Sequence, residues 1–348
     1  MWFHAHLVHE TAKHVWQGVA GMMIIDDSQS DALPLPRNYG VDDFALLLQD
    51  RRFTRDGQMP YAPTRQDRMQ GFTGNVPLVN GTVAPFLEAT TTLVRLRILN
   101  ASNGSIYQLG FDDGRRFQMI ASDGGLLAAP VPMTAILLAP AERAEIVVPV
   151  TPGSRAMLRA RLQGGMMGGG MMGGAGGGAH ASTFDFLDLR GAAQLTPSPA
   201  LPATLARPDP LPALEGLPTR RFELEMSMGP AMALFGGGFR INGKSMKMSR
   251  INETVKMGQP EIWEISNTSP MAHPFHIHDT QFHILDRNGQ TPHPAEQGRK
   301  DTVLVNPRER VRILVQFDHY SDPKRPYMYH CHILEHEDAG MMGQFTVT

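Results

Sequence analysis

The sequence contains a single cysteine among its 348 residues. One thiol cannot form an internal disulfide or a cysteine-based zinc cluster, so disulfide-stabilised and zinc-finger folds are excluded. An excess of either charge is also lacking, since 32 Lys and Arg face 34 Asp and Glu for a net charge of -2. A near-neutral chain offers no basic surface, and we expect neither nucleic acid nor a membrane as a partner.

Long hydrophobic runs are missing as well. No stretch approaches the roughly 20 apolar residues that span a bilayer. Residues 1–6 lack the charged and then apolar layout of a signal peptide. We therefore expect a soluble chain with no export signal of its own. At roughly 150 residues per domain, its length suggests about two domains.

Short alternating segments dominate what is present. In residues 92–99 every second side chain is apolar, which is typical of a half-buried strand. Residues 311–317 alternate in the same way, and shorter runs occur at 145–148 and 262–265, with turn residues between them. No long segment has a helical period. The pattern predicts an all-β chain built of β-sandwich domains.

Two segments of unusual composition divide the chain. Residues 164–178 contain only Gly, Met and Ala, which predicts a flexible loop, and prolines stiffen residues 191–218 into an extended linker. We therefore expect one domain at 37–190 and the last domain at 219–348. Residues 1–36 hold too few strands to bury a core alone. They either dock on another domain or form the end of a domain whose beginning is absent.

Histidines gather in three places. They are His4 and His6; His273, His276 and His278; and His330, Cys331, His332 and His336, followed by Met341. On a strand, residues two apart share a face, so His330 and His332 can bind on one side and Cys331 on the other. A lone buried cysteine is usually a small hydrophobic residue, but several independent spacings would then agree by chance. For His4 and His6 alone, a structural role is equally open.

The ligand types indicate the metal. A thiolate, two imidazoles and a weak axial thioether form a blue-copper site. Cys331, His336 and Met341 follow one another at five-residue spacing, and His273 is the natural second imidazole. Imidazoles alone suit copper, iron, zinc or nickel. Because Cys331 is flanked by two of them, we favour further copper and electron flow between the sites.

The histidine-rich runs carry a family resemblance. The run His-Pro-Phe-His-Ile-His from residue 273 and the run His-Cys-His-Ile-Leu-Glu-His-Glu-Asp-Ala-Gly-Met from residue 330 resemble the two C-terminal copper signatures of multicopper oxidases. Residues 2–6 resemble the second N-terminal signature. The similarity covers nearly the whole chain and is closest to bacterial copper-efflux (cuprous) oxidases and bacterial laccases.

The resemblance implies tandem cupredoxin-like Greek-key β-sandwiches and three kinds of copper. It assigns type 1 copper to His273, Cys331, His336 and Met341, type 2 copper to His276, and type 3 copper to His4, His6, His278, His330 and His332. The implied activity is one-electron oxidation of phenolic or aromatic compounds or Cu(I), coupled to four-electron reduction of dioxygen to water. The implied location is periplasmic or extracellular.

The chain departs from the family at one signature. The first motif, His-X-His-Gly, would supply two of eight cluster histidines, and this sequence offers only six. We therefore expect an N-terminally truncated multicopper oxidase with most of its first cupredoxin domain absent, which loads type 1 copper but reduces dioxygen poorly. The alternative is a non-catalytic copper-binding or electron-transfer module. A copper nitrite reductase needs no histidine directly after the cysteine, so His332 argues against that class.

Two further positions follow from the resemblance. Glu337 lies where the cuprous oxidases place an acid thought to pass protons to the cluster, although a solvated turn carboxylate is equally open. Met271 falls on their substrate-copper methionine, whereas the paired acid is replaced by Ser269.

The remaining methionines have two predicted roles. Those of the Gly-rich loop, with His180 at its end, are predicted to capture labile copper, because such a loop has no core to fill. Met246, Met248 and Met257 are predicted to be core residues.

Overall fold

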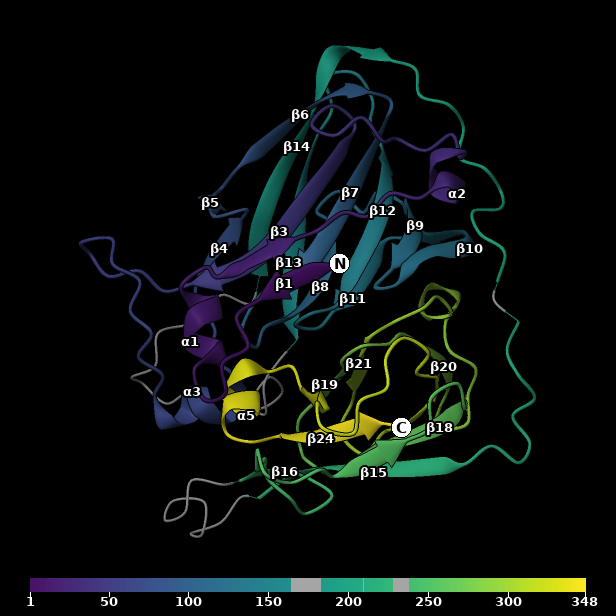
Figure 1. Cartoon of the computed structure of the whole chain (residues 1–348). Coiled ribbons are helices and arrows are strands. Elements are labelled where there is room, and N and C mark those ends of the chain that lie inside the picture. Colours follow the sequence, from purple (N-terminus) through teal and green to yellow (C-terminus); the bar gives the residue numbers. More distant parts are fainter. Residues whose placement is uncertain (164–182, 209, 228–237) are drawn as a thin grey trace. The chain divides into compact units, whose positions relative to one another are not determined.

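The computed structural model describes residues 1–163, 183–208, 210–227 and 238–348. These ranges form 24 strands, and none of their helices is longer than six residues (Figure 1). The prediction of an all-β chain is confirmed. The predicted Gly- and Met-rich loop at 164–178, with its methionine pairs and His180, lies outside the described residues.

The chain divides into two compact units. Unit 1 comprises Met1–Ala5 and Lys13–Arg207, and unit 2 comprises His6–Ala12 and Pro208–Thr348. The division falls within the predicted linker at 191–218. The assignment of residues 1–36 to a further domain stays a prediction.

Unit 1 contains three sheets. The seven-stranded sheet has the order β10 (Gly125–Met133), β9 (Phe117–Ser122), β12 (Arg143–Pro149), β7 (Leu93–Asn100), β3 (Asp43–Arg51), β4 (Val76–Val79) and β5 (Thr82–Val83). The five-stranded sheet has the order β11 (Ala135–Leu138), β8 (Ile106–Phe111), β13 (Arg155–Gln163), β14 (Thr183–Thr196) and β6 (Phe86–Thr91). The third sheet pairs β1 (Trp2–His4) with β2 (Ala20–Met22). The helices α2 (Ser28–Asp31) and α3 (Arg65–Gln70) belong to unit 1, whereas α1 (Thr11–Trp16) begins with two residues of unit 2 and continues in unit 1.

The centre of the seven-stranded sheet is the predicted strand at 92–99. It forms β7, which runs parallel to β3 and antiparallel to β12, and β12 contains the predicted run 145–148. Alternate residues of β7 bury Val94, Leu96 and Ile98. Between them, Arg97 pairs with Asp43 of β3 at 2.6 Å. Apolar alternation and cross-strand charge pairs therefore fix the same register.

Unit 2 consists of two five-stranded sheets. The first has the order β16 (Phe239–Ile241), β15 (Thr219–Met226), β18 (Glu261–Asn267), β22 (Arg310–Val315) and β20 (Phe282–Arg287). The second has the order β17 (Glu253–Val255), β24 (Met342–Val347), β23 (Tyr327–Cys331), β19 (His273–Ile277) and β21 (Thr302–Val305). The helix α5 (Leu334–Asp338) follows β23, and a 3-10 turn η1 spans Pro294–Glu296. The predicted runs 262–265 and 311–317 coincide with β18 and most of β22.

Aromatic side chains from both sheets form the core of unit 2. The ring of Phe222 lies 4.6 Å from that of Trp263 in its own sheet and 4.8 Å from that of Tyr329 in the other. Cys331 and Met341 are buried members of the same apolar cluster. The two sheets therefore pack face to face as a β-sandwich, and the thiol belongs to its interior.

The prediction for the methionines of unit 2 was wrong in part. Met248 is 61% exposed and Met257 is 51% exposed, and Met246 is half-buried. Met248 lies in the irregular chain between β16 and β17, and Met257 follows the end of β17. Neither position is part of the alternation that turns strand residues inward.

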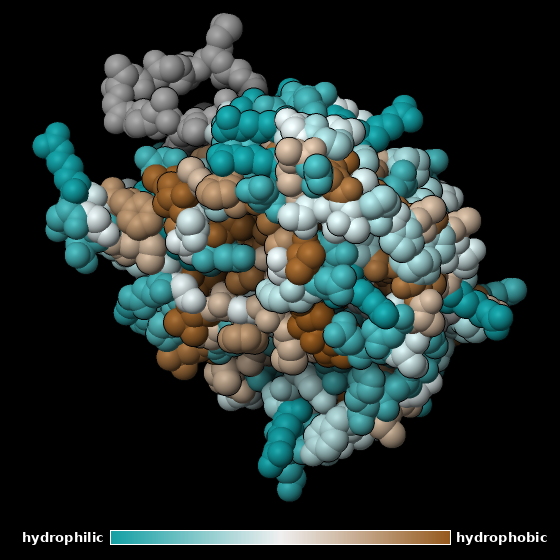
Figure 2. Space-filling model, turned by 90° about the horizontal axis from the view of Figure 1, so that it is seen from above, coloured by the Kyte–Doolittle hydropathy of each residue, from teal (hydrophilic) through white to brown (hydrophobic). Residues whose placement is uncertain are grey.

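The surface mixes apolar and polar residues. The face displayed in Figure 2 has brown apolar atoms interspersed with teal hydrophilic ones. Within the residues that the structure describes, we find no helix whose length and apolar character would let it cross a membrane.

Candidate metal centres

Two histidine-bearing strands lie side by side in unit 2. β19 pairs antiparallel with β23, so that Phe275 lies opposite Cys331 and His276 lies opposite His330. Neighbouring side chains of a strand point to opposite faces. The register therefore sends the thiol of Cys331 into the sandwich core and the imidazole of His330 to the other face of the sheet.

The first candidate centre joins Cys331 with two histidines. The Sγ atom of Cys331 lies 3.4 Å from His273 Nδ1 and 3.7 Å from His336 Nδ1, and the two Nδ1 atoms are 3.3 Å apart. All three side chains are fully buried. β19 supplies His273, β23 supplies Cys331 and α5 supplies His336. Residues from three elements thus place one sulfur and two ring nitrogens within 3.7 Å of one another.

The backbone brings Met341 to the same place. Its N–H donates to the carbonyl of His336 at 2.9 Å, and its carbonyl accepts from the N–H of Cys331 at 3.0 Å. The side chain is fully buried in the core cluster. The four residues predicted for type 1 copper are therefore neighbours, and their role as ligands stays a prediction.

Protonation at this centre is controlled by burial. Burial lowers the pKa of His273 well below its usual value, and the neighbouring His336 lowers it further. Burial also raises the pKa of the Cys331 thiol. A metal bound here would therefore displace the thiol proton of Cys331 and meet an uncharged His273. Two imidazoles and one thiolate fit the ligand set of a blue copper.

Three contacts hold these ligands. Ile333 donates its N–H to Cys331 Sγ at 3.4 Å, and the ring of Phe239 stacks on His336 with centroids 3.9 Å apart. The hydroxyl of Ser269 lies 2.7 Å from Nε2 of His273 and also donates to the carbonyl of Met271. The Ser269 oxygen therefore accepts a hydrogen bond from Nε2–H of His273, which leaves the Nδ1 lone pair facing Cys331.

Ser269 belongs to a turn anchored by Asn267. The Nδ2 atom of Asn267 donates to the carbonyls of Met271 at 2.8 Å and Val305 at 2.9 Å, and its Oδ1 accepts from the N–H of Ser269. Met271 is buried in the core cluster at this turn. The substrate-copper role predicted for Met271 stays a prediction.

The same turn recurs in unit 1. Asn100 donates to the carbonyls of Ser105 at 2.8 Å and Leu138 at 2.9 Å, and its Oδ1 accepts from the N–H of Ser102. The residue two beyond Ser105 is Tyr107, whereas the residue two beyond Met271 is His273. The turn is thus a shared scaffold, and only its copy in unit 2 faces a histidine.

The second candidate centre contains three histidines of unit 2. His330 Nε2 lies 3.1 Å from His278 Nε2 and 3.3 Å from His6 Nε2. One ring nitrogen of each lies within 4.8 Å of the others. His330 is fully buried, whereas His6 and His278 are half-buried. Three converging imidazoles suit copper as well as zinc.

His276 and His332 border this centre. The ring of His276 lies 5.3 Å from that of His330 and 5.6 Å from that of His332. Nδ1 of His276 lies 2.8 Å from the carbonyl of Asp301, to which it donates as the Nδ1–H tautomer, leaving Nε2 as the acceptor nitrogen. The structure brings all of these residues together, and their assignment to type 2 and type 3 copper stays a prediction.

His4 lies in unit 1 rather than in unit 2. Its ring stacks on that of Trp2 at 4.4 Å, and its Nδ1 donates to the carbonyl of Ala5 at 2.8 Å. The type 3 role predicted for His4 stays a prediction.

Glu337 is not the solvated turn carboxylate that the sequence left open. It is buried, with Oε2 3.1 Å from His330 Nδ1 and Oε1 3.7 Å from His6 Nε2. Burial lowers the pKa of His330, but the carboxylate of Glu337 outweighs this and raises it. For His6 burial prevails, and its pKa is lowered. The carboxylate thus faces the second centre, and its predicted proton-transfer role stays a prediction.

Sequence reasoning missed two of the supporting residues. Phe239 lies far upstream of His336, and no spacing connects the two. Asp338 stands next to Glu337 in the sequence, but its partners are in the N-terminal segment, where its carboxylate accepts from the N–H groups of Thr11 and Ala12.

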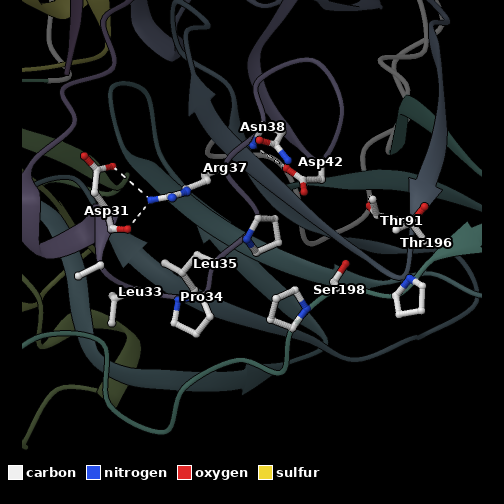
Figure 3. A pocket seen from close by; sticks show the side chains of 14 residues that line it. Asp31, Leu33, Pro34, Leu35, Arg37, Asn38, Asp42, Thr91, Thr196 and Ser198 are labelled. Atoms are coloured by element: carbon white, nitrogen blue, oxygen red, sulfur yellow. Dashed lines mark hydrogen bonds and ion pairs between the residues drawn. The ribbon is translucent and has the colours of Figure 1, made fainter.

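A separate pocket lies in unit 1 and has a volume of about 590 Å³ (Figure 3). At one end the guanidinium of Arg37 lies 3.8 Å from the carboxylate of Asp31, and elsewhere the N–H of Asn38 donates to Asp42 at 2.7 Å. None of the sequence-predicted metal ligands lines this pocket. Arg37 and Asp31 pair with each other and Asp42 accepts from the backbone, and we assign the pocket no ligand.

Curated relatives cover nearly all of the chain. "Cell division protein FtsP" of Xenorhabdus nematophila is 37% identical over 99% of this chain and 69% of the relative. The Escherichia coli protein of that name is 35% identical over 100% of this chain and 70% of its own length. These relatives are named for cell division and not for an oxidase. They contradict the prediction that the chain couples donor oxidation to dioxygen reduction, and they favour the non-catalytic alternative.

Solved structures identify the fold. A laccase-like multicopper oxidase, CueO of Ochrobactrum sp., superposes with a TM-score of 0.87 at 34% identity, covering 100% of this chain and 76% of the other. McoA of Aquifex aeolicus gives a TM-score of 0.86 at 31% identity, covering 100% and 75%. Residues 216–348 match the "Multicopper oxidase" family model. The predicted cupredoxin-like sandwiches are confirmed, and the chain belongs to the multicopper oxidase family.

Proposed function

We propose that this chain is a non-catalytic copper-binding protein that acts in cell division. The observation that carries the proposal is the identity of 35–37% with relatives named "Cell division protein FtsP", which extends over almost the whole chain. Relatives of the oxidase type share the fold at similar identity. The fold therefore does not decide between the two functions, whereas the names of the curated relatives favour cell division.

Copper would be held at the first candidate centre by His273, Cys331 and His336, with Met341 beside them. The buried, converging Sγ and Nδ1 atoms support this part of the proposal. When bound at such a site, copper supplies one-electron redox chemistry and an intense thiolate absorption. The residues themselves exclude water, keep the imidazole of His273 neutral and fix its orientation through Ser269.

We further propose a periplasmic location, because the bacterial multicopper oxidases that the sequence resembles are exported proteins. Fractionation of cells that express the full natural protein would test this. Recovery in the cytoplasmic fraction would contradict it.

The first experiment is copper quantification with absorption and EPR spectra, together with dioxygen uptake on the purified chain. We expect a type 1 signal and no dioxygen uptake above that of a Cys331→Ala variant. Sustained uptake with a phenolic donor or Cu(I), lost in Cys331→Ala, would overturn the non-catalytic part.

The second experiment tests cell division. The chain is exported behind an added signal peptide in Escherichia coli cells that lack their own FtsP, and cell length is measured under conditions in which that loss lengthens cells. We expect shorter cells on expression, and failure of an exported, folded chain to shorten them would count against the proposal. The cell length with Cys331→Ala is compared with that of the control His319→Ala, which removes an exposed histidine. The comparison shows whether the copper site is needed for the effect on cell length.

A further inference from the structure

The segment His6–Ala12 is separated from the rest of unit 2 along the chain by residues Lys13–Arg207 of unit 1, yet it packs as part of unit 2. It is compact, because the carbonyl of Leu7 accepts from the N–H of Glu10 at 2.9 Å and from the hydroxyl of Thr11 at 3.1 Å. Thr11 and Ala12 are fully buried. We call these residues the 6–12 segment.

One residue of α5 holds this segment by three hydrogen bonds. Asp338 Oδ1 lies 3.1 Å from the N–H of Thr11, and Oδ2 lies 2.9 Å from the N–H of Ala12. The carbonyl of Asp338 lies 2.7 Å from Nδ1 of His9. Hydrogen bonds to a carboxylate are about twice as strong as neutral ones. The two N–H groups open α1 and have no partner within that helix, so Asp338 satisfies both.

The backbone of the 6–12 segment is also in an uncommon conformation where it contacts Asp338. His9 has a φ of 71°, in the left-handed region that a residue with a side chain seldom adopts. Such a conformation persists where surrounding contacts determine it. The ring of His9 lies against the carbonyl of Asp338, which supplies such a contact.

The residue next to Asp338 acts on the same segment. Glu337 faces His6 at 3.7 Å and His330 at 3.1 Å. Two consecutive carboxylates of α5 therefore meet the 6–12 segment, one at its histidine and one at its backbone. α5 also carries His336 of the first centre. The helix α5 thus contributes a residue to the first centre, a carboxylate beside the second centre and the carboxylate that binds the 6–12 segment.

We infer that Asp338 is a positioning residue, which docks the 6–12 segment on unit 2 and so completes the three-histidine centre of His6, His278 and His330. Without docking, the three-histidine centre would keep only His278 and His330. The inference rests on the metal-binding part of the proposed function.

The test is titration of the full chain with Co²⁺ alone, followed by absorption. Cobalt on the thiolate of Cys331 gives a charge-transfer band, whereas cobalt on histidines gives only weak visible bands, so one titration reports both centres. Loss of a residue that supports metal ligands from outside the inner sphere typically costs about 10–100-fold in affinity, and Asp338 supports His6 through the 6–12 segment. For Asp338→Ala we expect a loss of roughly tenfold or more at the histidine centre, with the thiolate band retained.

Two variants and one metal-free measurement complete the experiment. Asp338→Glu keeps a carboxylate and should recover part of the affinity, and Asp318→Asn removes an exposed carboxylate of unit 2 and should change nothing. Amide hydrogen exchange of residues 6–12 should quicken in Asp338→Ala alone. Equal cobalt affinity and equal exchange in Asp338→Ala and the natural chain would overturn the inference. Absence of cobalt binding by the natural chain would refute the metal-binding part of the proposed function, and the exchange rates would then still decide docking.

Discussion

At the scale of single residues, the first metal centre depends on which nitrogen of His273 faces the sulfur. The hydroxyl of Ser269 lies against Nε2 at 2.7 Å, and the opposite nitrogen lies 3.4 Å from Cys331 Sγ. Ser269 thus orients the ring of His273. The cuprous oxidases that the sequence resembles have an acid at this position. Because serine is neutral, it fixes the ring without adding a charge to the buried site.

Replacing Ser269 by Ala should therefore weaken copper binding at Cys331 by roughly tenfold, since the orienting hydrogen bond is lost. Ser269→Thr keeps the hydroxyl and should retain most of the affinity. The measurement is a copper titration followed by the thiolate absorption band.

Ser102→Ala is the matched control for this prediction. It removes the equivalent hydroxyl from the turn in unit 1, where Ser102 contacts Asn100 and Ser105. Equal losses of copper affinity in Ser102→Ala and Ser269→Ala would mean that turn stability, and not the His273 contact, sets the affinity.

At the scale of elements, β24 supports the strand that carries the ligands. Gly343 lies opposite Tyr329 of β23, and a Cβ at this glycine would clash with the hydroxyl and the ring of Tyr329. The absence of a side chain therefore leaves room for the Tyr329 ring beside Gly343. The phenol in turn packs against the aromatic core, where it lies 4.8 Å from Phe222.

Gly343→Ala should destabilise the protein by about 1–3 kcal/mol, because the added methyl overpacks this contact. The free energy of unfolding in urea measures the effect. In a double variant with Tyr329→Leu the two losses should not add, since the smaller side chain relieves the clash. Additive losses would contradict the proposed contact.

The helix α3 in unit 1 illustrates an element whose stability depends on pH. Thr64 is its N-cap, and Asp67 closes a capping box by accepting from the N–H of Thr64 at 2.7 Å. The carboxylate of Asp67 also accepts from the guanidinium of Arg52 at 2.6 Å. Burial raises the pKa of Asp67, but the hydrogen bonds from Arg52 and Thr64 outweigh burial, and the pKa falls below its ordinary value of 3.8.

A depressed folded-state pKa means that the stabilising effect of Asp67 is present above pH 3.8 and is lost as the pH falls through the folded-state value. Asp67→Asn should therefore cost about 1 kcal/mol at pH 7 and less at pH 3. Urea unfolding at both pH values checks this. A difference between the two proteins that does not change with pH would contradict it.

At the scale of the whole molecule, each unit has sheets of its own. The candidate centre with Cys331 lies in the core of unit 2, whereas unit 1 has Tyr107 after the matching turn. Copper should therefore stabilise unit 2 alone.

Calorimetry with and without copper would test this. At a copper concentration of about 100 Kd, the stabilisation amounts to about 2.7 kcal/mol, and only the transition of unit 2 should move to higher temperature. A shift of both transitions by the same amount would contradict the assignment. Cys331→Ala should abolish the shift.

The sequence predicts the strands well because apolar residues recur at every second position within β7, at Val94, Leu96 and Ile98, and within β18, at Trp263 and Ile265. It also predicts that His273, His276, His330 and Cys331 belong to metal sites, because their spacing on β19 and β23 is local. Contacts across long distances in the chain are different. Nothing in the spacing indicates that Phe239 stacks on His336 or that Asp338 holds Thr11, since tertiary packing alone joins them.

Exposure of methionines could not be predicted for a similar reason. Met248 and Met257 are apolar in composition, but composition does not tell which way an irregular segment turns its side chains.

The pairing of β19 with β23 has a consequence for how the chain can change over evolutionary time. Substitutions near Cys331 alter one contact each, whereas insertion of one residue within β23 would exchange the faces of every side chain beyond it. The sulfur would then leave the apolar interior and an imidazole would enter it. Length variation should thus be confined to the connections, and β23 should be inherited as a block of fixed length.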